Sequence, residues 1–153
     1  MSRRVTVVCV LLLSLIGLTL GCSGNQGAKA QEVTFAQLLT NPDQYNGRYV
    51  SLEGFYFGGF EVAVLGEKLE YSGFAPGHLV PKGKMVWIEG GIPEEVYDRL
   101  HQQQMMGPLE RYGKVRVTGR FEFGGKYGHV GAYNSQIVPT EVVLLPWSPP
   151  GER

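Results

Sequence analysis

The chain has 153 residues, of which 43% are hydrophobic and 11% aromatic, so it is long enough to bury the core of one ordinary domain. Its 14 basic residues balance its 14 acidic residues, which disfavours a nucleic-acid binder, because such proteins ordinarily carry a basic face. Both of its cysteines, Cys9 and Cys22, lie within the first 22 residues, so the rest of the chain has no thiol.

The first 22 residues have the form of a bacterial lipoprotein signal. Arg3 and Arg4 precede an apolar segment, residues 5–20, and the run Leu18-Thr19-Leu20-Gly21-Cys22 closes it. Positive charge, a short apolar stretch and a small residue before the cysteine are typical of a secretory segment that is removed. The alternative is an uncleaved membrane anchor, but about 16 apolar residues fall short of the roughly 20 that span a bilayer.

The resemblance to lipoprotein signals implies that residues 1–21 are removed and that the thiol of Cys22 carries a diacylglyceryl group. Because more than one acyl chain gives stable anchoring, we expect an exported protein, anchored by its lipid to a bacterial membrane in the cell envelope. Arg3 and Arg4 leave with the signal, so 12 basic and 14 acidic residues remain. Cys9 leaves as well, and with Cys22 lipidated no thiol remains for a disulfide, a metal or a nucleophile.

Residues 22–32 are small and polar, which predicts a flexible tether. One domain, residues 33–147, is expected to follow, and residues 148–153 are expected to form a disordered tail. At the start of this domain, Thr34 and Gln37 predict a capping box for a short helix that Asn41-Pro42 ends.

Five strands are predicted after this helix, from alternating apolar and polar residues. They cover residues 48–57, 60–66, 85–89, 114–123 and 136–145. Gly58-Gly59 predicts a hairpin turn between the first two strands. Pro93 predicts a second short helix between the third and the fourth. Pro139 interrupts the fifth strand, which favours an edge or a bulge there.

This element order predicts a mainly β domain with two short helices. Three strands, a helix and two more strands are the order of the OB-fold, a five-stranded barrel with a helix between strands three and four; here a short N-terminal helix precedes it. A small β-sandwich is the alternative, but it offers no obvious place for the helix after the third strand.

Several motifs also resemble a family: small bacterial lipoproteins whose OB-fold domain is akin to the anticodon-binding domains of tRNA-handling proteins. The motifs are Leu38-Leu39-Thr40-Asn41-Pro42, Tyr45-Asn46-Gly47, the strand Val50–Gly54, the run Tyr112–Gly119, and Tyr127-Gly128-His129. The resemblance covers roughly residues 34–145. Because these are mostly glycine and turn positions and the family is largely uncharacterised, the resemblance implies a fold and leaves the function open.

Two glycine-rich connections, residues 68–84 and 124–134, are the candidate contact regions. Long loops of this kind are often functional, aromatic side chains on them can stack on sugars or bases, and the connection between the last two OB-fold strands commonly contacts ligand. The candidate ligand-binding residues are Tyr71, Phe74, His78, Tyr127, His129 and Tyr133. The alternative is that the aromatic residues close the ends of the barrel.

The sequence predicts no catalytic residue, no metal site and no cofactor. Its three histidines, His78, His101 and His129, are far apart and lack a nearby histidine, cysteine or carboxylate partner. His101 is expected at the C-terminal end of the Pro93 helix, followed by Met105-Met106 over the end of the barrel.

We therefore expect a non-enzymatic module that binds a glycan, a small ligand or an envelope protein through the two connections. The alternative is a structural or assembly component of an envelope protein complex, docked through its strand faces, the methionines or Trp147. A glycan-acting enzyme with paired carboxylates is disfavoured because no spacing pairs them. Nucleic-acid binding would require a basic stripe of Lys114, Arg116 and Arg120, and the acidic charge and the compartment disfavour it.

Overall fold

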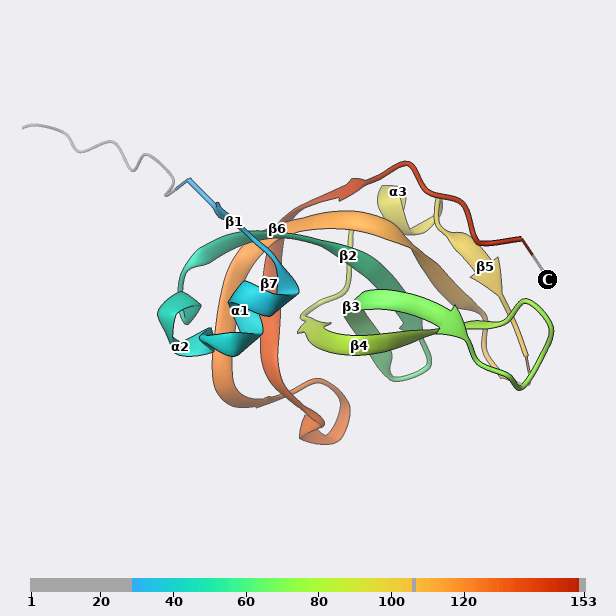
Figure 1. The fold of residues 1–153 in the computed structure, drawn as a ribbon, viewed down its shortest axis with the longest axis horizontal. Coiled ribbons are helices and arrows are strands. Elements are labelled where there is room, and N and C mark those ends of the chain that lie inside the picture. Colours follow the sequence, from blue (N-terminus) through green and yellow to red (C-terminus); the bar gives the residue numbers. More distant parts are fainter. Residues whose placement is uncertain (1–28, 106, 152–153) are drawn as a thin grey trace, which may run out of the picture.

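The computed structural model describes residues 29–105 and 107–151 (Figure 1). Cys22, the predicted signal and Met106 lie outside the described residues. Within them the protein is mainly β. The strands are β1 (Gln31–Val33), β2 (Tyr49–Gly59), β3 (Val62–Tyr71), β4 (Leu79–Ile88), β5 (His101–Gln103), β6 (Glu110–Tyr127) and β7 (Tyr133–Leu144). The helices are α1 (Phe35–Thr40), α2 (Pro42–Tyr45) and α3 (Glu94–Tyr97), with a 3-10 turn η1 (His129–Gly131).

The strands form one seven-stranded sheet with the order β1-β2-β3-β4-β7-β6-β5. β2 also pairs with β6, so β2, β3, β4, β7 and β6 follow one another in a closed ring of pairings. The β4–β7 and β1–β2 pairs are parallel, and the others are antiparallel. Figure 1 shows β2 and β6 as long curved strands that run together across the molecule.

The main core lies inside this ring. In β6, Val115, Val117 and Phe121 are fully buried, whereas Arg116 and Arg120 on the other face are exposed, which confirms the predicted period of two. Leu52 of β2 and Ile137 of β7 pack in the same cluster. Side chains on one face of the strands therefore fill the interior, and side chains on the other face lie at the surface.

Helix α1 begins as the sequence predicts. The Thr34 hydroxyl accepts from the Gln37 amide at 3.2 Å, and the Thr34 amide donates to Gln37 Oε1 at 2.9 Å, which completes a capping box. Phe35 and Leu38 are buried. At Gly54 a Cβ would lie 2.9 Å from the Phe35 ring, so this glycine lets α1 approach β2 closely.

The strands are longer than predicted, and the connections are correspondingly shorter. β3 continues to Tyr71 and β4 begins at Leu79, so the expected connection 68–84 is reduced to residues 72–78. A bulge between Gly66 and Lys68 lets the β3–β4 hairpin continue. Likewise, β6 extends to Tyr127, past an irregularity in its ladder, and leaves only residues 128–132 of the second connection.

Two further predictions about local structure were wrong. Gly58-Gly59 belongs to β2, and the turn falls at Phe60-Glu61, because the ladder with β6 continues through Gly58. His101 does not end a helix. α3 is a single turn that stops at Tyr97, and His101 begins β5, where its ring stacks on Tyr112 at 5.7 Å. Met105 follows in a bend and is exposed, so it does not cover the core.

The predicted bulge at Pro139 is confirmed. Thr118 pairs with Glu141 while Gly119 pairs with Pro139, so Thr140 is the extra residue in β7. β1 starts at Gln31, within the segment predicted as the tether, and extends the sheet beside β2. Among residues 29–105 and 107–151, no helix has the length and apolar character needed to cross a membrane.

Candidate functional site

His78 lies just before β4 and is 7% exposed, and its side chain is held by two hydrogen bonds. Its Nε2 is 2.9 Å from Glu110 Oε2, and its Nδ1 is 2.9 Å from Ser72 Oγ. Because a carboxylate only accepts, Nε2 donates to Glu110, and Nδ1 is hydrogen-bonded to the Ser72 hydroxyl. His78 therefore ties the loop 72–78 to β6 instead of presenting its ring at the surface.

Gln103 of β5 completes this connection. Its Oε1 accepts from the Leu79 amide at 3.0 Å, and its Nε2 donates to the Leu79 carbonyl at 2.6 Å and to Glu110 Oε2 at 2.8 Å. The Gln103 side chain thus bonds both the amide and the carbonyl of Leu79, as the backbone of a paired strand would. We call Ser72, His78, Leu79, Gln103 and Glu110 the latch; it holds the tip of the β3–β4 hairpin beside β5 (Figure 1).

The line Ser72–His78–Glu110 has the order of groups in a hydrolase relay. Ser72 Oγ, however, also accepts from the Phe74 amide at 3.1 Å, which makes it part of the turn. The histidine that would act as the base is buried. These hydrogen bonds hold the loop 72–78 against β6.

Tyr71 and Phe74 lie at the outer side of the same loop, where the C-terminal segment passes. The Tyr71 hydroxyl is 2.8 Å from the Pro150 carbonyl oxygen and 3.0 Å from that of Gly151. The Phe74 side chain is 82% exposed. Together these residues line a cleft of about 660 Å³. Residues 148–151, expected to be disordered, therefore run along the domain.

Trp147 fixes the start of this C-terminal segment. Its ring meets Phe55 edge-on at 5.1 Å and His101 edge-on at 5.5 Å, and Tyr112 lies 6.2 Å away. Edge-to-face contacts at these separations are favourable. The segment after Leu145 is thus attached at Trp147 and again at Tyr71.

Tyr127 and Tyr133 face each other across the end of the β6–β7 ladder and are half-buried. The Tyr133 ring lies 5.4 Å from that of Trp87, and the Tyr127 ring lies over Gly125. Burial raises the pKa of the Tyr133 hydroxyl. Both tyrosines pack at the base of the loop, and their role as ligand contacts stays a prediction.

His129 reaches a loop that the sequence did not mark as a site. Its Nε2 is 3.0 Å from Glu61 Oε2 in the β2–β3 turn. In the described part of the chain, Glu61 (φ 57°) and Val130 (φ 50°) are the two non-glycine residues with positive φ, and they belong to these two loops. Such a conformation is strained, above all for a β-branched residue, and tends to occur at functional sites.

Each of these loops holds one apolar side chain out in solvent. Phe60 is 69% exposed and Val130 is 87% exposed. We call Phe60, Glu61, His129 and Val130 the paired loop tips. No local pattern marks Phe60 or Val130 as exposed, because Phe60 was predicted to lie in a strand and Val130 in a glycine-rich loop. Trp87 was missed too, although its alternation with Val86 and Ile88 marks the outer face of β4.

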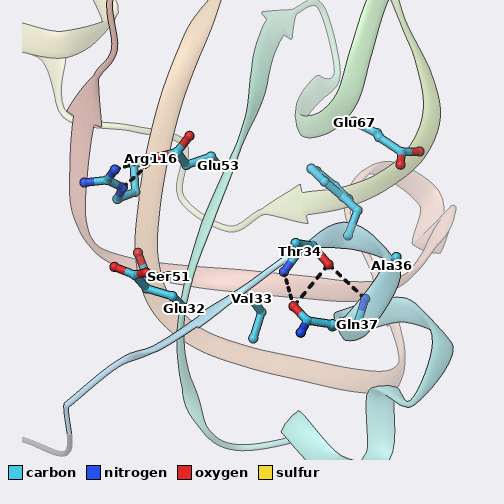
Figure 2. Close-up of a pocket in the computed structure, with 10 residues that line it drawn as sticks. Glu32, Val33, Thr34, Ala36, Gln37, Ser51, Glu53, Glu67 and Arg116 are labelled. Atoms are coloured by element: carbon cyan, nitrogen blue, oxygen red, sulfur yellow. Dashed lines mark hydrogen bonds and ion pairs between the residues drawn. The ribbon is translucent and has the colours of Figure 1, made fainter.

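A second cavity, of about 440 Å³, lies beside β1 and α1 (Figure 2). Figure 2 shows Glu53 and Arg116 turned toward one another on one side and Glu67 on the other. Arg116 Nε donates to Glu53 Oε1 at 3.1 Å, and Glu67 accepts from the Lys84 amide at 3.3 Å. These two carboxylates therefore already have partners within the fold.

The basic stripe on β6 is also largely compensated. Glu53 lies between Arg116 and Lys114, whose Nζ is 3.8 Å away, and Arg120 pairs with Glu122 at 2.6 Å. In residues 29–105 and 107–151, no group of three or more histidine, cysteine, aspartate or glutamate side chains is placed to hold a metal ion.

Comparisons with family models, with curated proteins and with solved structures found no match for this chain.

Proposed function

We propose that this protein is an exported, lipid-anchored OB-fold module that has no enzymatic activity and docks onto an envelope protein through the paired loop tips. The OB-fold assignment is supported by the pairing order. β2, β3, β4, β6 and β7 would be the five barrel strands, paired in the cyclic order 1-2-3-5-4 of that fold, and α3 follows the third strand. β1, α1, α2 and β5 would be additions to it.

One observation carries the docking proposal. Two loops from different strand pairs are joined by the His129–Glu61 contact, and both adopt strained backbone conformations that leave Phe60 and Val130 exposed. Exposing two large apolar side chains costs free energy in water, roughly 1.5 to 3 kcal/mol for each. A partner that buries them recovers this free energy, as in the central contacts of protein interfaces.

The shape of this surface favours a protein partner over a small ligand. Small ligands are bound in concave sites, whereas the cavities near α1 and near Tyr71 are lined by other residues. Apolar side chains that project from the surface, such as Phe60 and Val130, can insert into an apolar pocket on another protein. The compensated charges of Lys114, Arg116 and Arg120 argue against nucleic acid.

The proposed anchor restricts where the partner lies. Gln31, the first residue of β1, follows Cys22 by nine residues. A fully extended chain of that length spans roughly 30 Å. If Cys22 carries the lipid, the module stays close to the membrane, and its partner is a protein in or on that membrane.

A site-specific crosslinking experiment tests the proposal. A photoreactive phenylalanine analogue replaces Phe60 in the producing cell, and a matched control carries it at Tyr49, a 41% exposed aromatic residue at the other end of β2. We expect one discrete protein adduct from position 60 and none from position 49. Adding Val130→Asp is expected to reduce the adduct several-fold, because it places a charge in the same interface.

Two results would count against docking through the loop tips. One is equal crosslinking at positions 60 and 49 in a folded, membrane-bound chain. The other is an amide NMR titration with glycan fragments, short oligonucleotides or divalent metals that gives saturable shifts around Trp87, Tyr127 and Tyr133. The second result would assign the surface to a small ligand instead.

A further inference from the structure

The cleft between the loop 72–78 and the C-terminal segment has a distinctive chemistry. Among the described residues, its lining contains no charged side chain and consists of Tyr71, Phe74, two prolines, one alanine and three glycines. Its volume of about 660 Å³ lies within the range typical of ligand sites. An aromatic lining without cationic side chains offers no charged partner for a phosphate or a carboxylate and suits an uncharged ligand with apolar faces.

The chain itself places a ligand of this kind against Tyr71. Residues 146–151 read Pro-Trp-Ser-Pro-Pro-Gly, and prolines restrict such a segment to extended conformations. The Tyr71 hydroxyl reaches two of its main-chain carbonyls, those of Pro150 and Gly151. Aromatic grooves that recognise proline-rich peptides combine flat rings with donors to main-chain carbonyls in the same way.

The aromatic wall is only partly used by this segment. Phe74 remains 82% exposed and Tyr71 41% exposed, although both line the cleft. The latch holds this wall in place, because His78 and Gln103 fix the loop to β5 and β6. A rigid, half-covered aromatic wall is preorganised for a second extended chain.

We propose that this cleft is a binding site for an extended, uncharged, proline-containing peptide of another protein, and that the chain's own residues 149–151 occupy one edge of it. The incoming peptide packs its proline rings on Phe74 and Tyr71. It takes over the Tyr71 hydroxyl hydrogen bond from Pro150 and Gly151, so the tail competes with the partner for the same donor. This site is separate from the paired loop tips and does not depend on them.

The test is a titration of the full chain, isotope-labelled and held in detergent micelles, with a synthetic peptide of the sequence of residues 146–151. A second peptide with alanine at both positions equivalent to Pro149 and Pro150 is the control ligand. We expect saturable shifts at residues 71–77 with the proline peptide and at least several-fold weaker binding of the alanine peptide.

Changes in the protein are expected to act in opposite directions. Tyr71→Phe removes the donor but keeps the ring. Measured in a chain whose Pro149 and Pro150 are replaced by alanine, so that the tail competes less for that donor, it should weaken binding roughly three- to tenfold. Replacing Pro149 and Pro150 of the chain by alanine should tighten binding of the added peptide, because the internal competitor is weakened. Tyr49→Phe, at a tyrosine of equal exposure, should leave the affinity unchanged.

Three results would overturn the proposal. They are equal binding of the two peptides, an affinity that Tyr71→Phe does not change, and no saturable binding to the tail-substituted chain while its spectrum remains that of a folded domain. A concentration-dependent dimer that vanishes in the tail-substituted chain would instead assign the cleft to the tail of a second copy.

Discussion

Gly128 illustrates how one residue sets the geometry of the β6–β7 loop. Its φ is +69°, and a Cβ there would lie 2.7 Å from the Trp87 ring and 2.8 Å from the Tyr133 ring. Both the backbone conformation and the neighbouring rings therefore require glycine. This residue brings the chain close enough to Trp87 for the loop to turn toward Glu61.

A pair of glycine substitutions separates these two requirements. Gly124→Ala, at φ +86° with open space around it, should cost about 1 to 2 kcal/mol of unfolding free energy from backbone strain alone. Gly128→Ala should cost about 1 to 3 kcal/mol more, since the two rings must also move. Urea unfolding of both variants measures the difference, and equal destabilisation would show that the ring contacts are unimportant.

Tyr56 makes the stability of the fold dependent on pH in the alkaline range. Burial, helped by the nearby Tyr97, raises its pKa to about 12 from the ordinary value of 10. The unfolded chain therefore loses this proton first, so the stabilisation is complete below pH 10 and is lost as pH rises from 10 to 12. A shift of this size corresponds to roughly 2 to 3 kcal/mol.

The measurement is urea unfolding between pH 9 and pH 12 on the wild type and on Tyr56→Phe. The variant should lose less stability over this range, because phenylalanine has no proton to release. Tyr112 and Tyr133, whose pKa values are also raised by burial, keep part of the slope in both proteins. Parallel curves would contradict the assignment to Tyr56.

The β3–β4 hairpin is held at its tip by side chains from outside it. Gln103→Ala removes both hydrogen bonds to the Leu79 backbone and leaves a buried amide without its acceptor, which should cost about 1 to 3 kcal/mol. Hydrogen exchange at the Leu79 amide should accelerate by a corresponding factor. Gln102→Ala, one position earlier in β5, is the control. Equal exchange rates at the Leu79 amide in the two variants would show that Gln103 does not hold the tip of the hairpin.

Helix α1 offers a second test at the scale of an element. Thr34→Ala removes the hydroxyl that accepts from the Gln37 amide, and such caps are worth typically about 1 kcal/mol. Thr40→Ala, at the exposed end of the same helix, is the matched control and should change stability by less than half as much. Thermal unfolding of both variants decides between a stabilising cap and an incidental contact.

The elements that the sequence predicted are those with local signals. Period two marked β6, Thr34 and Gln37 marked the start of α1, and Pro139 marked the bulge in β7. β1 and β5 have three residues each, which is too short for any period to appear. The strand ends were misjudged because pairing with a neighbour, and not the local residues, decides where a ladder stops.

The site residues show the same limit more strongly. Tyr71, Phe74 and His129 were singled out for their loops, and the structure places them at the two surfaces argued above. The residues to which these sites are hydrogen-bonded are distant in sequence. Glu110, the partner of His78, is 32 residues away from it, and Pro150, the partner of Tyr71, is 79 residues away. Neither spacing nor composition predicts such contacts, because they arise only when the ring of strands closes.

At the scale of the whole molecule, the proposed lipid anchor has a direct test. Cys22→Ala should abolish incorporation of a labelled fatty acid into the protein made in a bacterial host, whereas Cys9→Ala, within the predicted signal, should leave it unchanged. Gel autoradiography or intact-mass analysis measures the modification. Labelling that persists in Cys22→Ala would place the lipid elsewhere and remove the basis for a module held near the membrane.

The closed ring of strands also governs when this protein can fold. β7 is the strand that joins β4 to β6 and closes the ring. Because β7 is the last strand of the described chain, the ring cannot close before nearly all of its residues are present. Pairing β2 with β6 joins segments about sixty residues apart, and such non-local contacts form slowly. On the proposed export route this late folding is an advantage, because a chain whose ring has not yet closed is still unfolded and can cross a membrane in an extended conformation.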